Sequence, residues 1–181
     1  MVESLQNLVD SIVASTAGLP APETLAQWDP ALSGIMDLRI TAQGRWIHEG
    51  REIQREGLVR LFASILRRED DGNYYLVTPV EKWQVSVERH ALQVIDCVQE
   101  SAGEETCWYG LLNTGGRCRI SAARPIHPAE GDDPPWIDAP NGLSAQINRP
   151  AWYRLVEAAD LDGDRVVIHS GGEAIDLGSS A

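Results

Sequence analysis

The alternation of apolar and polar residues is strongest in residues 74–87, YYLVTPVEKWQVSV. In its second part, KWQVSV, apolar residues recur at every other position, which is the pattern of a half-buried antiparallel strand. The two predicted strands are joined by Thr-Pro-Val-Glu-Lys, residues 78–82, although a tight hairpin would favour Asn-Gly or Asp-Gly. We name residues 78–82 the corner segment. Because Pro79 fixes φ and lacks an N–H, the first strand must stop or bend there.

A helical spacing of apolar residues predicts a helix that begins near Arg55. Its buried face is formed by Leu58, Val59, Leu61, Phe62, Ile65 and Leu66. Its polar face carries Arg60, Arg67, Arg68 and Glu69. A turn with Asp71-Gly72-Asn73 follows and leads into the strands described above.

A second helix is predicted from Asn148, which suits an N-cap, and Pro150, which suits the first turn. Its buried face is formed by Trp152, Tyr153, Leu155, Val156 and Ala159. A short amphipathic helix at the N-terminus, docked on the body, is indicated by Val2, Leu5, Leu8, Val9 and Ile12.

Residues 46–87 and 136–177 follow the same order of features, with small insertions and deletions. Trp46 aligns with Trp136, and Arg55 at the first helix start aligns with Arg149 at the second. We therefore expect two halves, residues 1–90 and 91–181. A true duplication and a chance agreement of two strand–helix–strand units both remain open.

Between the aligned segments, ALQVIDCVQE, CWYGLL and RCRIS have the composition of strands, and residues 123–140 are expected to form a loop or ordered linker rich in proline and acidic residues. The tail is expected to end in a short strand. Helices are few and do not alternate with parallel strands. The predicted class is α+β: two related halves, each an antiparallel sheet with one helix packed on it, plus the short N-terminal helix.

Charge and cysteine content narrow the classes of function. A formal net charge of -12 argues against nucleic acid and against an anionic membrane surface. No apolar stretch has the roughly 18 residues of a membrane span, and the N-terminus lacks the features of a signal peptide. The 3 cysteines do not form a disulfide framework, so we expect a reducing, cytoplasmic compartment and buried thiols.

Motifs for metals and common cofactors are absent from the sequence. A calcium loop counted from Asp160 needs glycine at its sixth position and glutamate at its twelfth, but Arg165 and Gly171 stand there, so a turn after the helix explains Asp160–Asp164 better. The spacing of the cysteines and His127 does not match a zinc site. We expect neither a metal nor a cofactor.

Charged residues near the predicted helix starts are the first candidates for a binding site. Arg55 and Arg149 each stand where free N–H groups and a positive field would suit a carboxylate or phosphate, or they anchor helix to sheet as structural salt bridges. Arg39 points away from the apolar face of its strand, as surface charge would. His48 beside Glu49 suits either an acid–base pair or a solvent-facing turn.

The corner segment supplies the second group of candidates. A bend at Pro79 would present Thr78, Glu81 and Lys82 together at the end of the sheet. They form either a partly buried network that tethers Arg39 or Arg55, or a polar pocket for a small ligand. Exposed ion pairs contribute only about 0–1 kcal/mol, so stability alone explains such a polar segment poorly.

These features resemble the DUF1285 family of bacterial proteins of unknown function, over residues 20–178. The most specific match is Leu76–Lys82. Others are Trp28-x-Pro30, Gly34, Asp37-x-Arg39-Ile40, Gly44-x-Trp46, Gly50, Ile53-x-Arg55, Leu58-Val59-x-Leu61-Phe62, Asn148-Arg149-Pro150, Tyr153, Ser170-Gly171-Gly172 and Leu177-Gly178. The chain departs from the family pattern at residues 87–92.

The resemblance implies a two-part α+β protein with a ligand site near the junction of its halves, a signalling role and no established catalysis. We expect a non-enzymatic regulatory or sensor protein that binds a small polar or anionic metabolite. The expected ligand-binding residues are Arg39, His48, Arg55, Thr78, Glu81, Lys82, Arg149 and Ser170. The alternatives are an enzyme that uses His48 and Glu81, and a protein-interaction module with an exposed aromatic patch. Homo-oligomerisation stays open.

Overall fold

The computed structural model describes residues 22–103 and 105–179. The predicted N-terminal helix lies outside these ranges. The chain divides into two compact units, Met1–Arg89 and His90–Ala181, and each is described by itself. Within the described ranges, no helix has the length and apolar character needed to cross a membrane.

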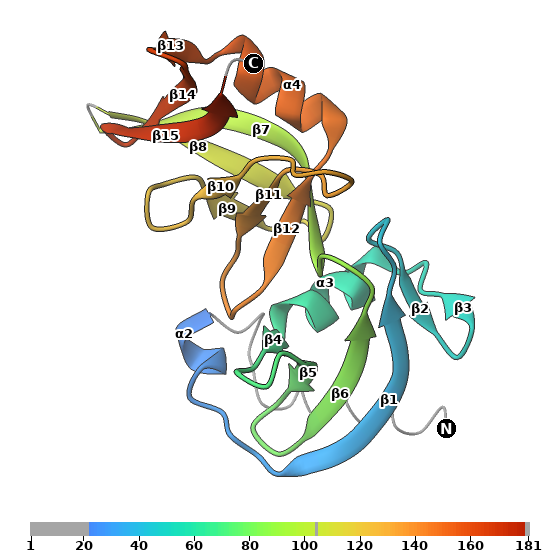
Figure 1. The fold of residues 1–181 in the computed structure, drawn as a ribbon. Coiled ribbons are helices and arrows are strands. Elements are labelled where there is room, and N and C mark those ends of the chain that lie inside the picture. The colour runs from blue at the N-terminus through green and yellow to red at the C-terminus, as the bar shows by residue number, and fades with distance from the viewer. Residues whose placement is uncertain (1–21, 104, 180–181) are drawn as a thin grey trace. The chain divides into compact units, whose positions relative to one another are not determined.

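The first unit is built on one sheet with the strand order β3-β2-β1-β6-β5-β4 (Figure 1). Its elements are α2 (Pro22–Leu25), β1 (Leu32–Ile40), β2 (Trp46–His48), β3 (Arg51–Glu52), α3 (Glu56–Ser64), β4 (Leu66–Arg68), β5 (Tyr74–Val77) and β6 (Lys82–Val87). Strands β1–β3 and β4–β6 each form an antiparallel meander. The two meanders join through a parallel pair, β1 with β6, so the sheet is mixed rather than purely antiparallel as predicted.

Helix α3 packs on one face of this sheet. The ring of Phe62 lies 6.3 Å from the ring of Trp46 on β2, and both side chains are buried. The helix ends at Ser64, so the prediction that Arg67, Arg68 and Glu69 line its polar face is wrong. Residues 66–68 instead pair with 74–76, because the Asp-Gly-Asn turn between them folds this segment back as a hairpin.

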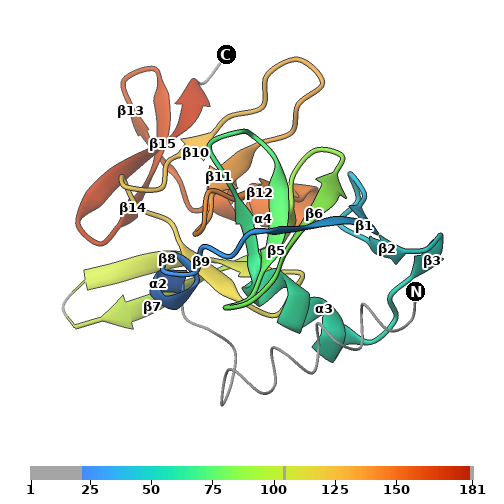
Figure 2. The same cartoon turned by 90° about the horizontal axis from the view of Figure 1, so that it is seen from below.

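The second unit contains a six-stranded sheet, β10-β11-β12-β7-β8-β9, and a three-stranded sheet, β13-β14-β15 (Figure 2). Its elements are β7 (Leu92–Ala102), β8 (Glu105–Leu112), β9 (Arg117–Arg119), β10 (Ile126–His127), β11 (Trp136–Asp138), β12 (Ser144–Ile147), α4 (Arg149–Glu157), β13 (Asp160–Asp162), β14 (Arg165–Ser170) and β15 (Glu173–Ser179). Strands β12 and β7 are parallel, so this sheet is also mixed.

Two predictions about this unit are wrong in detail. The expected loop over residues 123–140 contains β10 and β11, which pair with each other. The expected turn at Asp160 begins with β13, so the segment after α4, like the segment after α3, is the first strand of a hairpin. Pairing with the next strand overrides the local sequence signal in both places.

The start of α4 follows the prediction. Asn148 is the N-cap, and its Oδ1 accepts a hydrogen bond from the Ala151 N–H at 2.9 Å. Its Nδ2 donates to the Ile95 carbonyl at 3.2 Å, which ties the helix start to β7. Leu155, on the buried face of this helix, is fully buried.

The core of the second unit contains the cysteines as small buried residues. Cys97, Cys107 and Cys118 are free thiols and are at most 2% exposed. Burial raises the pKa of Cys97 to about 12 and that of Cys118 to about 11, so these thiols stay protonated. Trp108 is 4% exposed and gives this core its largest side chain, as Trp46 at 2% does in the first unit.

Candidate functional site

The corner segment is a closed turn. The Thr78 Oγ1 accepts hydrogen bonds from the Glu81 N–H at 3.0 Å and the Val80 N–H at 3.3 Å. The Thr78 N–H donates to the Glu81 carbonyl at 2.9 Å, and Thr78 is fully buried. The threonine therefore shapes the turn with its hydroxyl and its N–H, and both groups are engaged within the turn rather than facing a ligand.

The side chains of Glu81 and Lys82, at the end of the turn, have different contacts. The Glu81 Oε2 is buried and has no hydrogen-bond partner within residues 22–103 and 105–179. The Lys82 ammonium contacts the Glu69 carboxylate at 3.2 Å and the Asp29 carboxylate at 4.0 Å, and lies 5.3 Å from the Tyr75 ring centre. Lysine and glutamate at adjacent positions thus do not pair with each other.

Lys82 belongs to a network that fixes residues 25–29 on the sheet. The Arg67 guanidinium donates to the Leu25 carbonyl at 3.1 Å and the Trp28 carbonyl at 2.8 Å, and also to Glu69. Glu69 accepts from Arg67 and Lys82 together. One of the two alternatives for the corner segment was a network that tethers Arg39 or Arg55; the arginine in the network is Arg67.

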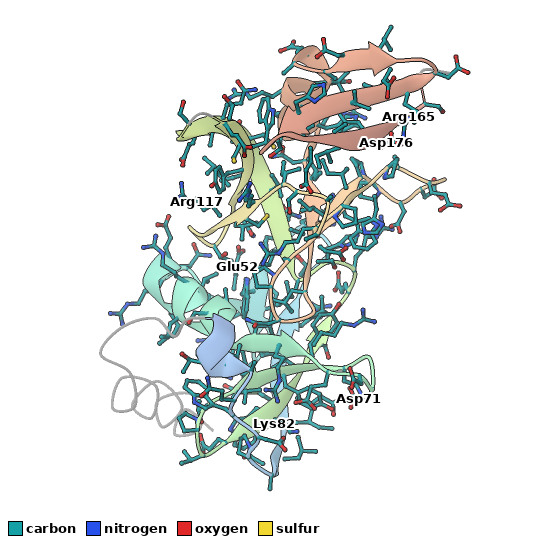
Figure 3. All side chains as sticks on the ribbon, turned by 90° about the vertical axis from the view of Figure 1, so that its left-hand side faces the viewer. Glu52, Asp71, Lys82, Arg117, Arg165 and Asp176 are labelled. Atoms are coloured by element: carbon teal, nitrogen blue, oxygen red, sulfur yellow. The ribbon has the colours of Figure 1, made fainter. Side chains whose placement is uncertain are left out.

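A hollow of about 520 Å³ opens beside this network. We name it the strand-edge hollow. It is lined by Ala26, Trp28, Asp29, Arg67, Arg68, Glu69, Asp70 and Asp71. Figure 3 labels Asp71, in the turn between β4 and β5, and Lys82, at the start of β6.

Two carboxyl groups of this hollow are held in their ionised form. For Glu69, burial favours the neutral acid, but hydrogen bonds and charges from Arg67 and Lys82 outweigh it and lower the pKa. For Asp71, the hydrogen bond from the Tyr75 hydroxyl at 2.6 Å is the main cause of a lowered pKa. The same bond raises the pKa of Tyr75.

A second hollow, of about 450 Å³, lies where the β2–β3 turn meets the first turn of α3. We name it the helix-start hollow. It is lined by His48, Glu49, Arg51, Glu52, Ile53 and Leu58. Glu52, labelled in Figure 3, pairs with Arg45 at 3.8 Å. Within the described part of the chain, the side chains of His48 and Arg51 have no hydrogen-bond or ion-pair partner.

Backbone geometry in the helix-start hollow is unusual. Glu49 has φ of 47° and Gly50 has φ of 73°, so the turn places a glutamate in the left-handed region. Arg55 is the N-cap of α3, its side chain makes no capping hydrogen bond, and it is exposed. The helix therefore presents free N–H groups near this hollow.

The other predicted residues are dispersed. Arg39 pairs with Glu88 at 3.0 Å on the exposed face of β1. Arg149 is the first residue of α4 and is exposed; it belongs to the second unit, whereas Arg55 belongs to the first. His48 pairs with Leu38 on β1, while Lys82, next to Glu81, pairs with Leu32. That register separates His48 from Glu81 by roughly 20 Å along β1.

Ser170 has a structural role in the second unit. Its fully buried hydroxyl accepts from the Trp108 N–H at 2.9 Å and donates to the Ile120 carbonyl at 2.6 Å. The next residue, Gly171, donates its N–H to the Thr106 carbonyl at 2.9 Å. These bonds fasten the three-stranded sheet to the six-stranded sheet, so the hydroxyl is not available to a ligand.

The sequence prediction missed Trp28, Asp29, Arg51, Arg67 and Glu69. Arg67 and Glu69 were assigned to a helix, where they would not share a face with Lys82. On the hairpin they do, since Glu69 directly follows β4 and lies two residues after Arg67, so both side chains point to one face of the sheet. The signal that indicates this is the turn at residues 70–73, which suits a hairpin as well as a helix exit.

The chain was compared with known proteins by sequence and by structure. The family model described as "Domain of unknown function (DUF1285), N-terminal domain" matches residues 23–90. A crystal structure of a DUF1285 family protein from Silicibacter pomeroyi DSS-3 is 30% identical, with a TM-score of 0.81, and the match covers 96% of this chain and 95% of that one. The chain belongs to the DUF1285 family.

A second DUF1285 structure, from Shewanella baltica OS155, is 28% identical with a TM-score of 0.55. That match covers 68% of this chain and 92% of the other. No curated protein matches the chain. The resemblance noted from the sequence is therefore confirmed, together with an α+β fold rich in strands, for a DUF1285 protein whose two six-stranded sheets are mixed.

Proposed function

We propose that this DUF1285 protein is a non-enzymatic regulatory protein that binds a small polar or anionic metabolite in the helix-start hollow. The observation that carries the proposal is the convergence of unengaged donors there. His48 and Arg51 line the hollow without partners in the described chain, and α3 begins beside it with an uncapped N-terminus. Free N–H groups, a positive helix end and an arginine suit a carboxylate or phosphate.

Binding fits this arrangement better than catalysis does. General acid–base chemistry needs two groups within about 3 Å of a common substrate atom. His48 and Glu81, the pair expected for an enzyme, lie at opposite ends of the β1 register. His48 also lacks a second side chain to orient its ring within the described residues.

The strained turn supports a role for this hollow. A glutamate with φ of 47° is costly, and such residues are concentrated at binding sites. Glu49 lines the hollow, so its carboxylate would orient a hydroxyl or amino group of a ligand whose acidic group contacts Arg51.

Thermal unfolding with a library of small carboxylates and phosphates tests the proposal. A ligand at a hundredfold excess over its Kd is expected to raise Tm by about 5–10 °C. The Arg51→Ala variant should lose the shift. Arg60→Ala, on an exposed position of α3 outside the hollow, should keep it. If no compound in the library shifts Tm, or if Arg51→Ala responds like the parent, the proposal is wrong.

We also infer that the two units derive from one ancestral motif. In the first unit, meander β1–β3, helix α3 and meander β4–β6 follow in order; in the second, β10–β12, α4 and β13–β15 do. In each unit the first strand of the motif contacts its last strand. In the first unit β1 and β6 form a parallel pair, and in the second β10 contacts β15. The Glu49-Gly50 turn has its counterpart in Asn141-Gly142, where φ is 63° and 70°.

A further inference from the structure

Strand β4 is one of the two edge strands of the first sheet. The Glu69 N–H donates to the Asn73 carbonyl, and the Val77 N–H donates to the Ile65 carbonyl. Because hydrogen-bonded positions alternate along an antiparallel pair, residues 65, 67 and 69 face β5, and the N–H and C=O groups of Leu66 and Arg68 point away from it. Across the described residues, no strand pairs with this second edge of β4.

The strand-edge hollow lies along that free edge. Arg67 pairs with Tyr75 and Arg68 pairs with Tyr74, so their side chains leave β4 on opposite faces of the sheet. Both nevertheless line the hollow. Lining residues from both faces of the sheet indicate that the hollow lies at the edge of the strand, where Ala26, Trp28 and Asp29 also line it.

The charge that remains available in this hollow is negative. The Arg67 guanidinium is engaged by two carbonyls and Glu69, and Arg68 donates to the Gly72 carbonyl at 3.3 Å beside the Tyr74 ring. Asp29 has a side chain that is 90% exposed, and Asp70 is exposed with no partner in the part of the chain described. Trp28, half-buried, adds an aromatic surface.

We propose that this hollow is a docking site for an extended basic peptide segment of another protein, which adds to the sheet as a strand beside β4. The backbone of Arg68 supplies the hydrogen bonds, and Asp29 and Asp70 attract the basic side chains. A second copy of this chain is a poorer occupant, because its net charge of -12 would meet an acidic hollow. The site is separate from the helix-start hollow, so each proposal stands or fails alone.

A blocked synthetic peptide of alternating lysine and valine is the probe, and isothermal titration calorimetry is the measurement. Attraction between the peptide's lysines and the acidic hollow predicts binding that weakens with salt. Methylating the backbone nitrogens on one edge of the peptide should abolish binding, although charge and side chains are unchanged. A peptide of alternating glutamate and valine should not bind. If the methylated peptides bind as tightly as the parent peptide, or if the lysine peptide does not bind, the proposal is wrong.

A matched pair of variants isolates the backbone of β4. Arg68→Pro and Arg68→Ala both lose the guanidinium, but only proline removes the outward N–H, and an edge position tolerates it. We expect Arg68→Pro to bind the lysine–valine peptide about tenfold more weakly than Arg68→Ala. Equal affinities would contradict strand addition. The methylated peptides still decide the question if the proline variant fails to fold.

Two further measurements test the role of the acidic side chains and the possibility that the chain binds a second copy of itself. Asp70→Asn should weaken binding and reduce its dependence on salt, whereas Asp164→Asn in the second unit should do neither. Sedimentation of the chain alone distinguishes the other occupant. A dimer that Arg68→Pro converts to monomer would show that the edge pairs with a second copy, and would overturn the proposal of a basic partner.

Discussion

Gly110 lies on β8, which is the middle one of three neighbouring strands, β7, β8 and β9, in the second unit. It pairs with Cys97 on β7 and with Cys118 on β9, so the two cysteines lie on either side of it in one row. Two strand spacings amount to about 10 Å between their Cα atoms, which is too far for a disulfide. The gap above the glycine is filled by the side chains of Val94 and Cys118.

A methyl group at position 110 is therefore expected to destabilise the fold. Its carbon would lie 3.0 and 3.1 Å from the two Val94 methyls and 3.5 Å from the Cys118 Sγ. We expect Gly110→Ala to lower the free energy of unfolding by about 1–3 kcal/mol, measured by urea denaturation followed by circular dichroism. Gly116→Ala is the control, because its nearest contact is 3.6 Å. Similar stabilities for the two variants would contradict this packing.

Glu69 gives the network a dependence on pH. A carboxyl with a lowered folded-state pKa stabilises the fold above its unfolded pKa, and that contribution is lost as pH falls through the folded-state pKa. We expect Glu69→Gln to be less stable than the parent at neutral pH, and the difference to shrink as pH falls below the ordinary value of 4.5. Urea titrations across this range measure it. Glu157→Gln, at an exposed position of α4, should show no such convergence.

At the scale of elements, hairpins determine where the two helices end, which the helical spacing of apolar residues left ambiguous. Both helices are shorter than predicted, because the residues after them pair as strands. The hairpins before the helices share one turn geometry. The central residues of each, Glu49-Gly50 and Asn141-Gly142, have positive φ. That geometry favours Asn-Gly, so only the second turn has the preferred sequence.

Exchanging the residues of these turns should have opposite effects. We expect Glu49→Asn to raise the free energy of unfolding by about 0.5–1 kcal/mol, because asparagine tolerates the left-handed region better than glutamate. Asn141→Glu should lower it by a similar amount. Chemical denaturation of both variants provides the measurement. If both changes shift stability in the same direction, backbone conformation is not the controlling factor.

At the scale of the whole molecule, the sequence predicted the class of the fold but not the arrangement of its strands. Local patterns revealed most strands, the Asn148 cap and the buried cysteines, because each depends on neighbours in sequence. Parallel pairing of β1 with β6 depends on residues about fifty positions apart, which no local pattern encodes. The sequence also indicated Lys82 as a candidate site residue. It did not reveal the partners of Lys82, Glu69 and Asp29, because those contacts join different elements of the fold.

Ser170 joins the two sheets of the second unit, so removing its hydroxyl should destabilise β8 as well as its own strand, β14. We expect Ser170→Ala to cost about 1–3 kcal/mol, since the Trp108 N–H and the Ile120 carbonyl would be left buried without a partner. Hydrogen exchange at the Trp108 amide should become faster. Ser179→Ala, at the exposed end of β15, should be neutral. Unchanged exchange at Trp108 would mean that the hydroxyl does not secure β8.

The burial of one indole in each core makes the two units separately observable by intrinsic fluorescence. Trp46 is 2% exposed in the first unit and Trp108 is 4% exposed in the second. A variant that keeps one of these indoles, with the other tryptophans replaced by phenylalanine, would report on one core alone. Emission from the two single-tryptophan proteins would then reveal whether the cores melt together or in sequence.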